Sequence, residues 1–376
     1  MLAPMTAYVC PRCQVHAPDS SLTWCCPRCR GPWDLEFTAA PVSLPSLASR
    51  VNSLWRYEEA LPLATEPAHG TQAPHVTLGE GRTPLVPLDG AVSAKLDFLM
   101  PTLSFKDRGA VMLAELARRL GPRTVLADSS GNAGTAIAAY CARAGLDCAV
   151  YVPEATSAKK LEQIRAHGAR TVVVPGDREA TARAARAAAD EPGVFYASHV
   201  YNPHFLHGTK TYVYELWEDL GGRLPDTLVL PVGNGTLLLG AALAVEELLA
   251  HELVERRPVL VAVQAEAVAP LAAAFRAGAA EPAAPAPVRP TLAEGIAIPA
   301  PPRAARILRA VRACGGTFRT VTEEQLRAAQ LDLARRGLYV EPTGAACWAA
   351  VRAAPERPGT TVLPLCGAGA KTGLAA

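Results

Sequence analysis

Residues 124–153 read TVLADSSGNAGTAIAAYCARAGLDCAVYVP, and this stretch indicates the fold class. The run at 124–130 is typical of a buried strand, 133–145 of a helix, and 148–153 of a second strand. Strands that are joined by a helical crossover run parallel to each other. The stretch therefore predicts one strand–helix–strand unit of an α/β fold.

The same alternation of short apolar runs and helical patterns continues toward the C-terminus. We therefore expect an α/β architecture that is built on open, mostly parallel sheets. The runs expected to form strands are 170–176, 227–232, 257–264 and 360–369, and those expected to form helices are 157–168, 178–190 and 237–250.

The composition of the 376-residue chain argues against several classes of protein. Charged residues make up 19% and the formal net charge is +2, which is unlike a protein built to neutralise nucleic-acid phosphates or anionic lipids. No uninterrupted apolar run is long enough to span a membrane, and the N-terminal MLAPMTAYVC lacks the basic and apolar regions of a signal peptide. We expect a soluble cytoplasmic protein with neither nucleic acid nor membrane as partner.

Half of the ten cysteines lie between residues 10 and 29. Two Cys-x-x-Cys pairs separated by twelve residues are typical of a zinc ribbon, which we expect over residues 1–38, with a structural zinc ion. Unliganded or disulfide-bonded cysteines and a nucleic-acid-binding ribbon remain alternatives, and Cys25 has a wider spacing to Cys29. The expected metal ligands are Cys10, Cys13, Cys26 and Cys29. Residues 39–75 are expected to form a linker with one packing helix at 46–61.

A lysine occurs in the apolar stretch TLSFKDRG at residues 102–109, directly before a helical pattern. The positive end of the helix dipole and the nearby Arg108 would both lower the pKa of Lys106. A neutral amine is what a Schiff base with an aldehyde requires. The alternative is a surface lysine whose ammonium group reaches solvent.

Two glycine-containing loops lie between an expected strand and an expected helix. SSGNAG at 129–134 offers small residues and the two-sided amide of Asn132, although it also loosely resembles a dinucleotide-binding turn. PVGNGT at 231–236 offers backbone amides at a helix N-terminus, which suit a phosphate group, although a plain tight turn would look the same. No Gly-Lys-Ser/Thr follows, which argues against a nucleoside-triphosphate site.

A cysteine stands at the carboxyl end of the last expected strand, in LPLCGAGAKT at 363–372. Ligands of open α/β sheets bind at that end, although Cys366 could equally be a buried apolar residue. These residues together describe one ligand, which offers an aldehyde to Lys106, a phosphate to the 233–236 loop and a polar ring to Asn132 and Cys366. Pyridoxal 5′-phosphate meets all three requirements.

Eight motifs in the expected order make the chain resemble the threonine synthase-like, fold-type II pyridoxal-phosphate enzymes, some of which carry an N-terminal zinc ribbon. The resemblance covers nearly the whole chain. It implies a homodimer and a catalytic region at 76–376 with the tryptophan synthase beta-like fold. This region would have two subdomains, a smaller one at about 98–205 and a larger one at about 76–97 plus 206–376. The motifs are LGEGRTPL (78–85), SFKDRG (104–109), SSGNAG (129–134), NPHFLHGTKT (202–211), PVGNG (231–235), EGIAIP (294–299), VEPTGAA (340–346) and CGAGAK (366–371).

The resemblance also implies a role for each matching residue. Lys106 would bind the cofactor covalently and then move protons at the substrate α and β carbons. Asn132 would hydrogen-bond the ring oxygen, and Cys366 would face the pyridine nitrogen. The residues implied to hold the cofactor phosphate are Gly233, Asn234, Gly235 and Thr236, and those implied to bind substrate are Ser129, Ser130, Asn202 and Lys210.

Two positions depart from the pattern of threonine synthases. Phe205 stands where an arginine is expected to bind the phosphate of O-phosphohomoserine, so that His204, His207 or Lys210 would have to compensate. Cys366 stands where a threonine is expected. The expected activity is a lyase that converts O-phosphohomoserine to threonine and phosphate. The alternatives are a serine/threonine dehydratase, a β-replacement enzyme, or a catalytically silent zinc-ribbon binding protein.

Overall fold

The computed structural model describes residues 6–63, 75–156, 158–287, 289–354 and 359–374. The chain forms two compact units. Unit 1 comprises Met1–Gly81 and Lys106–Thr209, and unit 2 comprises Arg82–Phe105 and Lys210–Ala376. This division differs from the expected subdomain boundaries, because the Phe98 and Phe105 amides donate to the Leu365 and Cys366 carbonyls at 2.8 and 2.9 Å and so attach residues 98–105 to unit 2.

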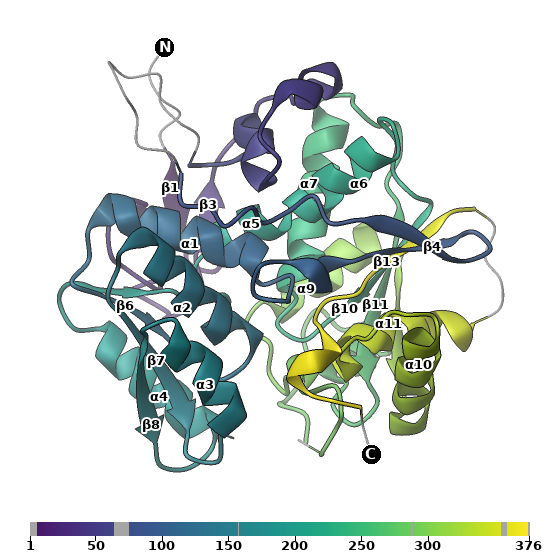
Figure 1. The fold of residues 1–376 in the computed structure, drawn as a ribbon. Coiled ribbons are helices and arrows are strands. Elements are labelled where there is room, and N and C mark those ends of the chain that lie inside the picture. The colour runs from purple at the N-terminus through teal and green to yellow at the C-terminus, as the bar shows by residue number, and fades with distance from the viewer. Residues whose placement is uncertain (1–5, 64–74, 157, 288, 355–358, 375–376) are drawn as a thin grey trace. The chain divides into compact units, whose positions relative to one another are not determined.

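Unit 1 is built on a four-stranded parallel sheet (Figure 1), with strand order β8-β7-β6-β9. The β-rich runs of the sequence form these strands, and capped helices connect them: Gly121 and Gly145 end α1 and α2 in the left-handed conformation. The bounds are β6 Thr124–Ala127, β7 Cys148–Pro153, β8 Arg170–Val174, β9 Val194–Tyr196, α1 Asp107–Leu120, α2 Asn132–Ala144, α3 Ala158–Ala166, α4 Arg178–Ala189 and α5 His204–Thr209.

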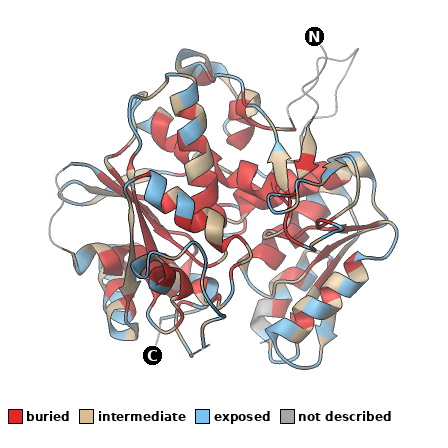
Figure 2. Ribbon diagram, turned by 180° about the vertical axis from the view of Figure 1, so that it is seen from behind, coloured by how far each residue is buried: buried red, intermediate tan, exposed pale blue. Residues whose placement is uncertain are grey.

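The two faces of this sheet bury different partners, as the alternation of side chains along a strand requires. Val125, Ala127 and Val150 join the core formed with α1, α2 and α3, whereas Leu126 lies in a second cluster with Ala185 of α4. Figure 2 shows helices that are buried on the side facing the sheet and exposed on their outer side.

The N-terminal part of unit 1 carries a small antiparallel sheet of the order β2-β1-β3. Its strands are β1 Ala7–Val9, β2 His16–Pro18 and β3 Asp34–Glu36. The helix expected at 46–61 is instead two 3-10 helices, η1 Leu44–Ser49 and η2 Leu54–Ala60. Ser53 accepts the Trp55 amide and starts the second one, and burial of Trp55 and Tyr57 outweighs the local helical preference. Part of the expected linker, residues 64–74, lies outside the described residues.

Unit 2 contains a six-stranded sheet of the order β12-β11-β10-β13-β5-β4, in which all neighbouring pairs are parallel except β4 with β5. Helices α10 and α11 cover one face through a core that includes Val261, Leu363 and Trp348. The strands are β4 Leu85–Asp89, β5 Val92–Lys95, β10 Thr227–Pro231, β11 Val259–Ala265, β12 Thr317–Val321 and β13 Thr361–Pro364.

Among the helices of unit 2, α7 begins directly after a loop that contains Gly233 and Gly235. In the ranges that the structure describes, no helix combines the length and the apolarity needed to cross a membrane. The bounds are η3 Asp97–Leu99, α6 Thr211–Asp219, α7 Thr236–Ala250, α8 Pro270–Arg276, η4 Glu294–Ile296, α9 Ala304–Ala313, α10 Glu323–Arg335, α11 Pro342–Arg352 and η5 Gly369–Lys371.

Candidate active site

Lys106 is the N-cap residue of α1, which is the position predicted from the sequence. Its side chain is half-buried, and Nζ lies 5.6 Å from the centre of the Phe205 ring. A glycine is required one turn further along α1, because a Cβ on Gly109 would lie 2.4 Å from that same ring. Close packing of α5 on the first turn of α1 therefore places an aromatic ring beside the lysine.

The Ser129–Asn132 turn links β6 to α2, and Asn132 is the first residue of that helix. The Ser129 hydroxyl accepts the Gly131 amide at 3.3 Å, which closes the turn. Gly134 makes the turn possible, because a Cβ there would stand 1.7 Å from the Ser129 carbonyl oxygen. Ser130 and Asn132 are half-buried, so part of each residue is accessible to solvent.

Asn202 follows β9, the strand that pairs in parallel with β6. The carboxyl ends of neighbouring parallel strands lie at one edge of a sheet, so the segments after β6 and β9 share that edge. The Asn202 Oδ1 atom accepts the His204 amide at 3.0 Å, which holds the side chain in place at the start of α5. Phe205, the residue that replaces the expected arginine, is fully buried on α5.

The sequence analysis missed one titratable residue in this part of unit 1, His199. Its ring lies 5.8 Å from the Phe205 ring, in an edge-on arrangement. Burial lowers the pKa of His199 well below its ordinary value, and the positive charges of Lys106 and Arg178 lower it further. The imidazole is therefore neutral at physiological pH. No local pattern marks this residue, because its position depends on the pairing of β9 with β6.

In unit 2, the Gly233–Thr236 loop connects β10 to α7. A Cβ on Gly233 would lie 2.9 Å from the Ile296 Cα atom, and Gly235 has a φ of +76°, so this path of the backbone favours glycine at both positions. Within the described part of the chain, no backbone carbonyl accepts the amides of Gly233, Asn234 or Gly235. These donors at a helix N-terminus fit a phosphate group.

Cys366 follows β13, which pairs in parallel with β10. The cysteine and the Gly233–Thr236 loop therefore lie at the carboxyl edge of the same sheet. Cys366 is buried, and its carbonyl accepts the Phe105 amide at 2.9 Å. The structure thus brings together the residues that the sequence analysis assigned to the cofactor phosphate and to the ring nitrogen.

Lys210 is buried in unit 2 and has a carboxylate partner. Its Nζ donates to Glu247 at 2.7 Å, and the Tyr214 hydroxyl donates to the same carboxylate at 2.9 Å. Burial lowers the pKa of Lys210, and Glu247 opposes this effect only in part. This arrangement gives Lys210 a structural role in joining α6 to α7, and its predicted role in substrate binding stays a prediction.

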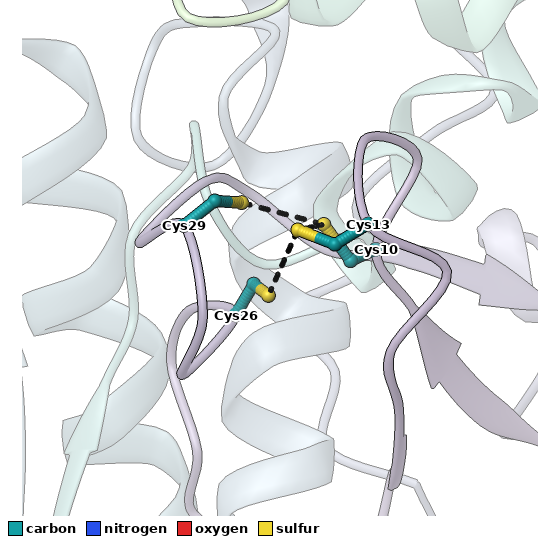
Figure 3. A group of neighbouring side chains, drawn as sticks. All are labelled: Cys10, Cys13, Cys26 and Cys29. Atoms are coloured by element: carbon teal, nitrogen blue, oxygen red, sulfur yellow. Dashed lines mark hydrogen bonds between the residues drawn. The ribbon is translucent and has the colours of Figure 1, made fainter.

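The four cysteines predicted as metal ligands form one cluster (Figure 3), with ligand sulfurs that all lie within 4.8 Å of one another. The Cys10 sulfur is 3.5 Å from those of Cys13 and Cys29, and the sulfurs of Cys13 and Cys26 are 3.8 Å apart. A tetrahedral zinc site with four thiolates requires sulfur separations of about 3.8 Å. Cys25 lies elsewhere, in the cluster that contains Trp24 and Ala185.

Most of the chain is similar to proteins of a known family. The family model described as pyridoxal-phosphate dependent enzyme matches residues 76–367. The threonine synthase of Methanosarcina acetivorans is 32% identical over 91% of this chain and 85% of its own length. That of Methanocaldococcus jannaschii is 32% identical over 85% of this chain and 80% of its own.

Solved structures of the same fold are also similar to this chain. A threonine deaminase from T.th. is 31% identical, with a TM-score of 0.63 over 74% of this chain and 87% of its own. Maize serine racemase is 19% identical, with a TM-score of 0.62 over 74% of this chain and 83% of its own, and this likeness concerns the fold alone.

Proposed function

The chain belongs to the pyridoxal-phosphate dependent enzymes and is a threonine synthase-like lyase, and from this premise we propose that it converts O-phosphohomoserine and water to threonine and phosphate. The observation that carries the proposal is the placement of Lys106 at the N-terminus of α1, on the same unit as the Ser129–Asn132 turn. A catalytically silent scaffold would not need a lysine at this position.

The residues present fit the cofactor. We propose that Lys106 binds it covalently, that Asn132 hydrogen-bonds its ring oxygen and that Cys366 faces its ring nitrogen. The amides of the Gly233–Thr236 loop, which lack backbone acceptors among the described residues, would hold its phosphate, and the Thr236 hydroxyl would add a donor. When bound, the cofactor supplies an electron sink for negative charge at the substrate α carbon.

The proton transfers would be the work of Lys106. Its amine would remove protons from the α and β carbons as a general base, and as a general acid it would return protons at the γ carbon, which phosphate leaves, and at the α carbon, while water supplies the hydroxyl group at the β carbon. The serine hydroxyls of Ser129 and Ser130 and the amide of Asn202 would orient the substrate carboxylate. The fully buried Phe205 ring beside Nζ would exclude water from this side of the lysine.

Phe205 favours a second candidate function, a dehydratase that acts on serine or threonine. An aromatic ring offers no hydrogen bond to a phosphate, whereas an arginine would donate two. The same ring suits a small, uncharged substrate side chain, and the similar structure of a threonine deaminase is in line with this candidate.

Parallel incubation with O-phosphohomoserine, threonine and serine tests the proposal. The purified protein, loaded with cofactor, should release inorganic phosphate from O-phosphohomoserine and form threonine in equal amounts. Oxo acid and ammonia from threonine or serine would instead support the dehydratase. The Lys106→Ala variant is the matched control and should abolish whichever activity is found, whereas turnover that survives this change would refute the role of Lys106.

We also propose that the cluster of Cys10, Cys13, Cys26 and Cys29 holds one structural zinc ion. The sulfur separations fit a tetrahedral site, and four thiolates leave no open position for chemistry on the metal. Elemental analysis should find one zinc per chain in the wild-type protein and a loss of zinc in Cys26→Ser. Cys25→Ser, which changes a thiol outside the cluster, should keep the metal.

Two further proposals concern the assembly and the location of the protein. We propose a homodimer in the cytoplasm, on the basis of the family resemblance. Light scattering after size-exclusion chromatography should give twice the 39.5 kDa mass of one chain. The mass of a single chain would refute the dimer.

A further inference from the structure

One side of the cysteine ribbon lies against the segment that follows β9. The Tyr8 ring meets the His204 ring edge-on, with centres 5.9 Å apart and planes at 85°. The Asn202 side chain lies within reach of the Tyr8 hydroxyl. Phe37, just after β3, meets His207 in the same way at 5.4 Å and 87°. The ribbon therefore contacts this segment at three positions.

A second group of ribbon contacts lies on either side of β9. The Trp24 indole and the Arg30 guanidinium both donate to Asp190, which caps α4, at 2.9 and 2.8 Å. The Trp24 ring also packs edge-on against Tyr196 and Tyr201, at 5.3 and 5.0 Å. The two groups of contacts lie at the two ends of residues 190–207, and they join the ribbon to the rest of unit 1.

The opposite side of α5 lies on α1. A Cβ on Gly208 would come within 2.0 Å of the Arg108 carbonyl oxygen, and Phe205 packs directly on Gly109. The Phe205 ring is also the group beside the Lys106 amine, at 5.6 Å. Helix α5 is therefore packed between the ribbon and the helix that begins with the proposed cofactor lysine.

The ribbon has a very small core of its own. Its buried cluster consists of Tyr8, Cys10, Cys26 and Trp33, and two of these four residues are proposed metal ligands. A domain with so little apolar burial depends on its metal for folding. Tyr8 belongs both to this cluster and to the contact with α5, so the position of its ring depends on the integrity of the cluster.

We propose that the metal-loaded ribbon positions α5, with Tyr8 and Phe37 as positioning residues that fix where Phe205 stands beside Lys106. The ribbon then acts on the substrate-binding side of the lysine without touching substrate itself. This inference rests on the proposed function, because it takes Lys106 as the cofactor lysine and the cysteine cluster as a metal site. It gives the ribbon a role beyond holding a structural metal.

Hydrogen–deuterium exchange of the full-length holoenzyme tests the physical link. Removal of the metal with a chelator should speed amide exchange in peptides from the ribbon, and also in peptides that cover 202–209 and the first turn of α1. Faster exchange that is confined to residues 6–36 would overturn the proposal. This readout needs no turnover and so does not depend on the identity of the substrate.

Two conservative variants test the positioning residues with the metal in place. Tyr8→Phe removes only the hydroxyl beside Asn202, and Phe37→Leu removes the ring that meets His207. Loss of one such contact should raise the substrate KM by roughly fivefold, with a smaller change in kcat and with unchanged zinc and cofactor content. His16→Gln, on the exposed strand β2 of the same ribbon, is the matched control and should leave KM as it is.

These experiments distinguish a failure of the positioning role from a failure of the proposed function. Equal KM values for wild type, Tyr8→Phe and Phe37→Leu would overturn the positioning role even in an active, cofactor-loaded enzyme. A wild-type protein that takes up no pyridoxal phosphate would refute the proposed function. In that case the exchange experiment, carried out on the zinc-loaded protein, still decides whether the ribbon holds α5.

Discussion

Replacement of His204 by phenylalanine should make the protein less sensitive to acid. His204 is fully buried on α5, where its ring meets Tyr8 of the ribbon. Nδ1 lies 3.2 Å from the Asn202 Oδ1 atom, and Nε2 has no hydrogen-bond partner among the described residues. A second proton would thus place a charge on a nitrogen that nothing nearby can stabilise.

The size of the effect follows from the shift in pKa. Burial lowers the pKa of His204 from 6.5 to about 3, and the charge of Arg119 contributes in the same direction. Because the unfolded chain binds this proton more readily than the native one, stability falls as the pH drops below 6.5, and the loss is complete only near pH 3. Between pH 7 and pH 5 this single group should remove about 2 kcal/mol.

Urea unfolding of wild type and His204→Phe, followed by tryptophan fluorescence at pH 7 and pH 5, measures this difference. Groups that titrate in both proteins, the cysteine cluster included, cancel when the two pH-dependent losses are subtracted. His204→Gln is a second non-titrating variant that separates the loss of the charge from the loss of the ring. Equal losses of stability in all three proteins would refute the assignment of a buried neutral histidine between the ribbon and α5.

Three other changes test the site and its support. The Cβ of Gly131→Ala would meet no atom closer than 3.9 Å, so this variant should fold normally but take up less cofactor. The Cβ of Gly134→Ala would stand 1.7 Å from the Ser129 carbonyl oxygen, so this variant should have a lower urea midpoint. Phe205→Arg should lower the KM for O-phosphohomoserine roughly tenfold relative to Phe205→Leu, because it adds a charge-assisted hydrogen bond to the substrate phosphate. An unchanged KM would show that the missing arginine does not explain the specificity. Glu247→Gln removes the negative charge that pairs with the buried Lys210 ammonium at 2.7 Å and should cost about 3 to 5 kcal/mol in urea unfolding. The double variant Lys210→Met, Glu247→Leu should largely reverse this loss.

The sequence predicted the parts of the fold that depend on local patterns. The runs at 124–130, 148–153 and 170–176 form β6, β7 and β8, and 227–232 forms β10, because short β-branched runs between turn residues are strand signals in any context. The prediction of one helix at 46–61 was wrong, because burial of the Trp55 and Tyr57 side chains divides this stretch into two 3-10 helices. Tertiary packing outweighed propensity there.

The candidate site shows the same limit. Spacing alone identified the four clustered cysteines, and a lysine before a helix identified Lys106. The neutral His199 and the partner of Lys210 could not be predicted, because each depends on elements that are distant in sequence: β9 beside β6 in the first case, and α6 beside α7 in the second. The contact of the ribbon with α5 likewise joins residues about 170 to 200 positions apart.

Borohydride reduction of the cofactor-loaded protein, followed by mass spectrometry of its peptides, tests the central claim most directly. The account predicts a single modified peptide, with the mass of the reduced cofactor on the lysine of SFKDRG at 104–109. The Lys106→Ala protein should yield no modified peptide. Cofactor attached to any other lysine, or a wild-type protein that carries none, would contradict the account.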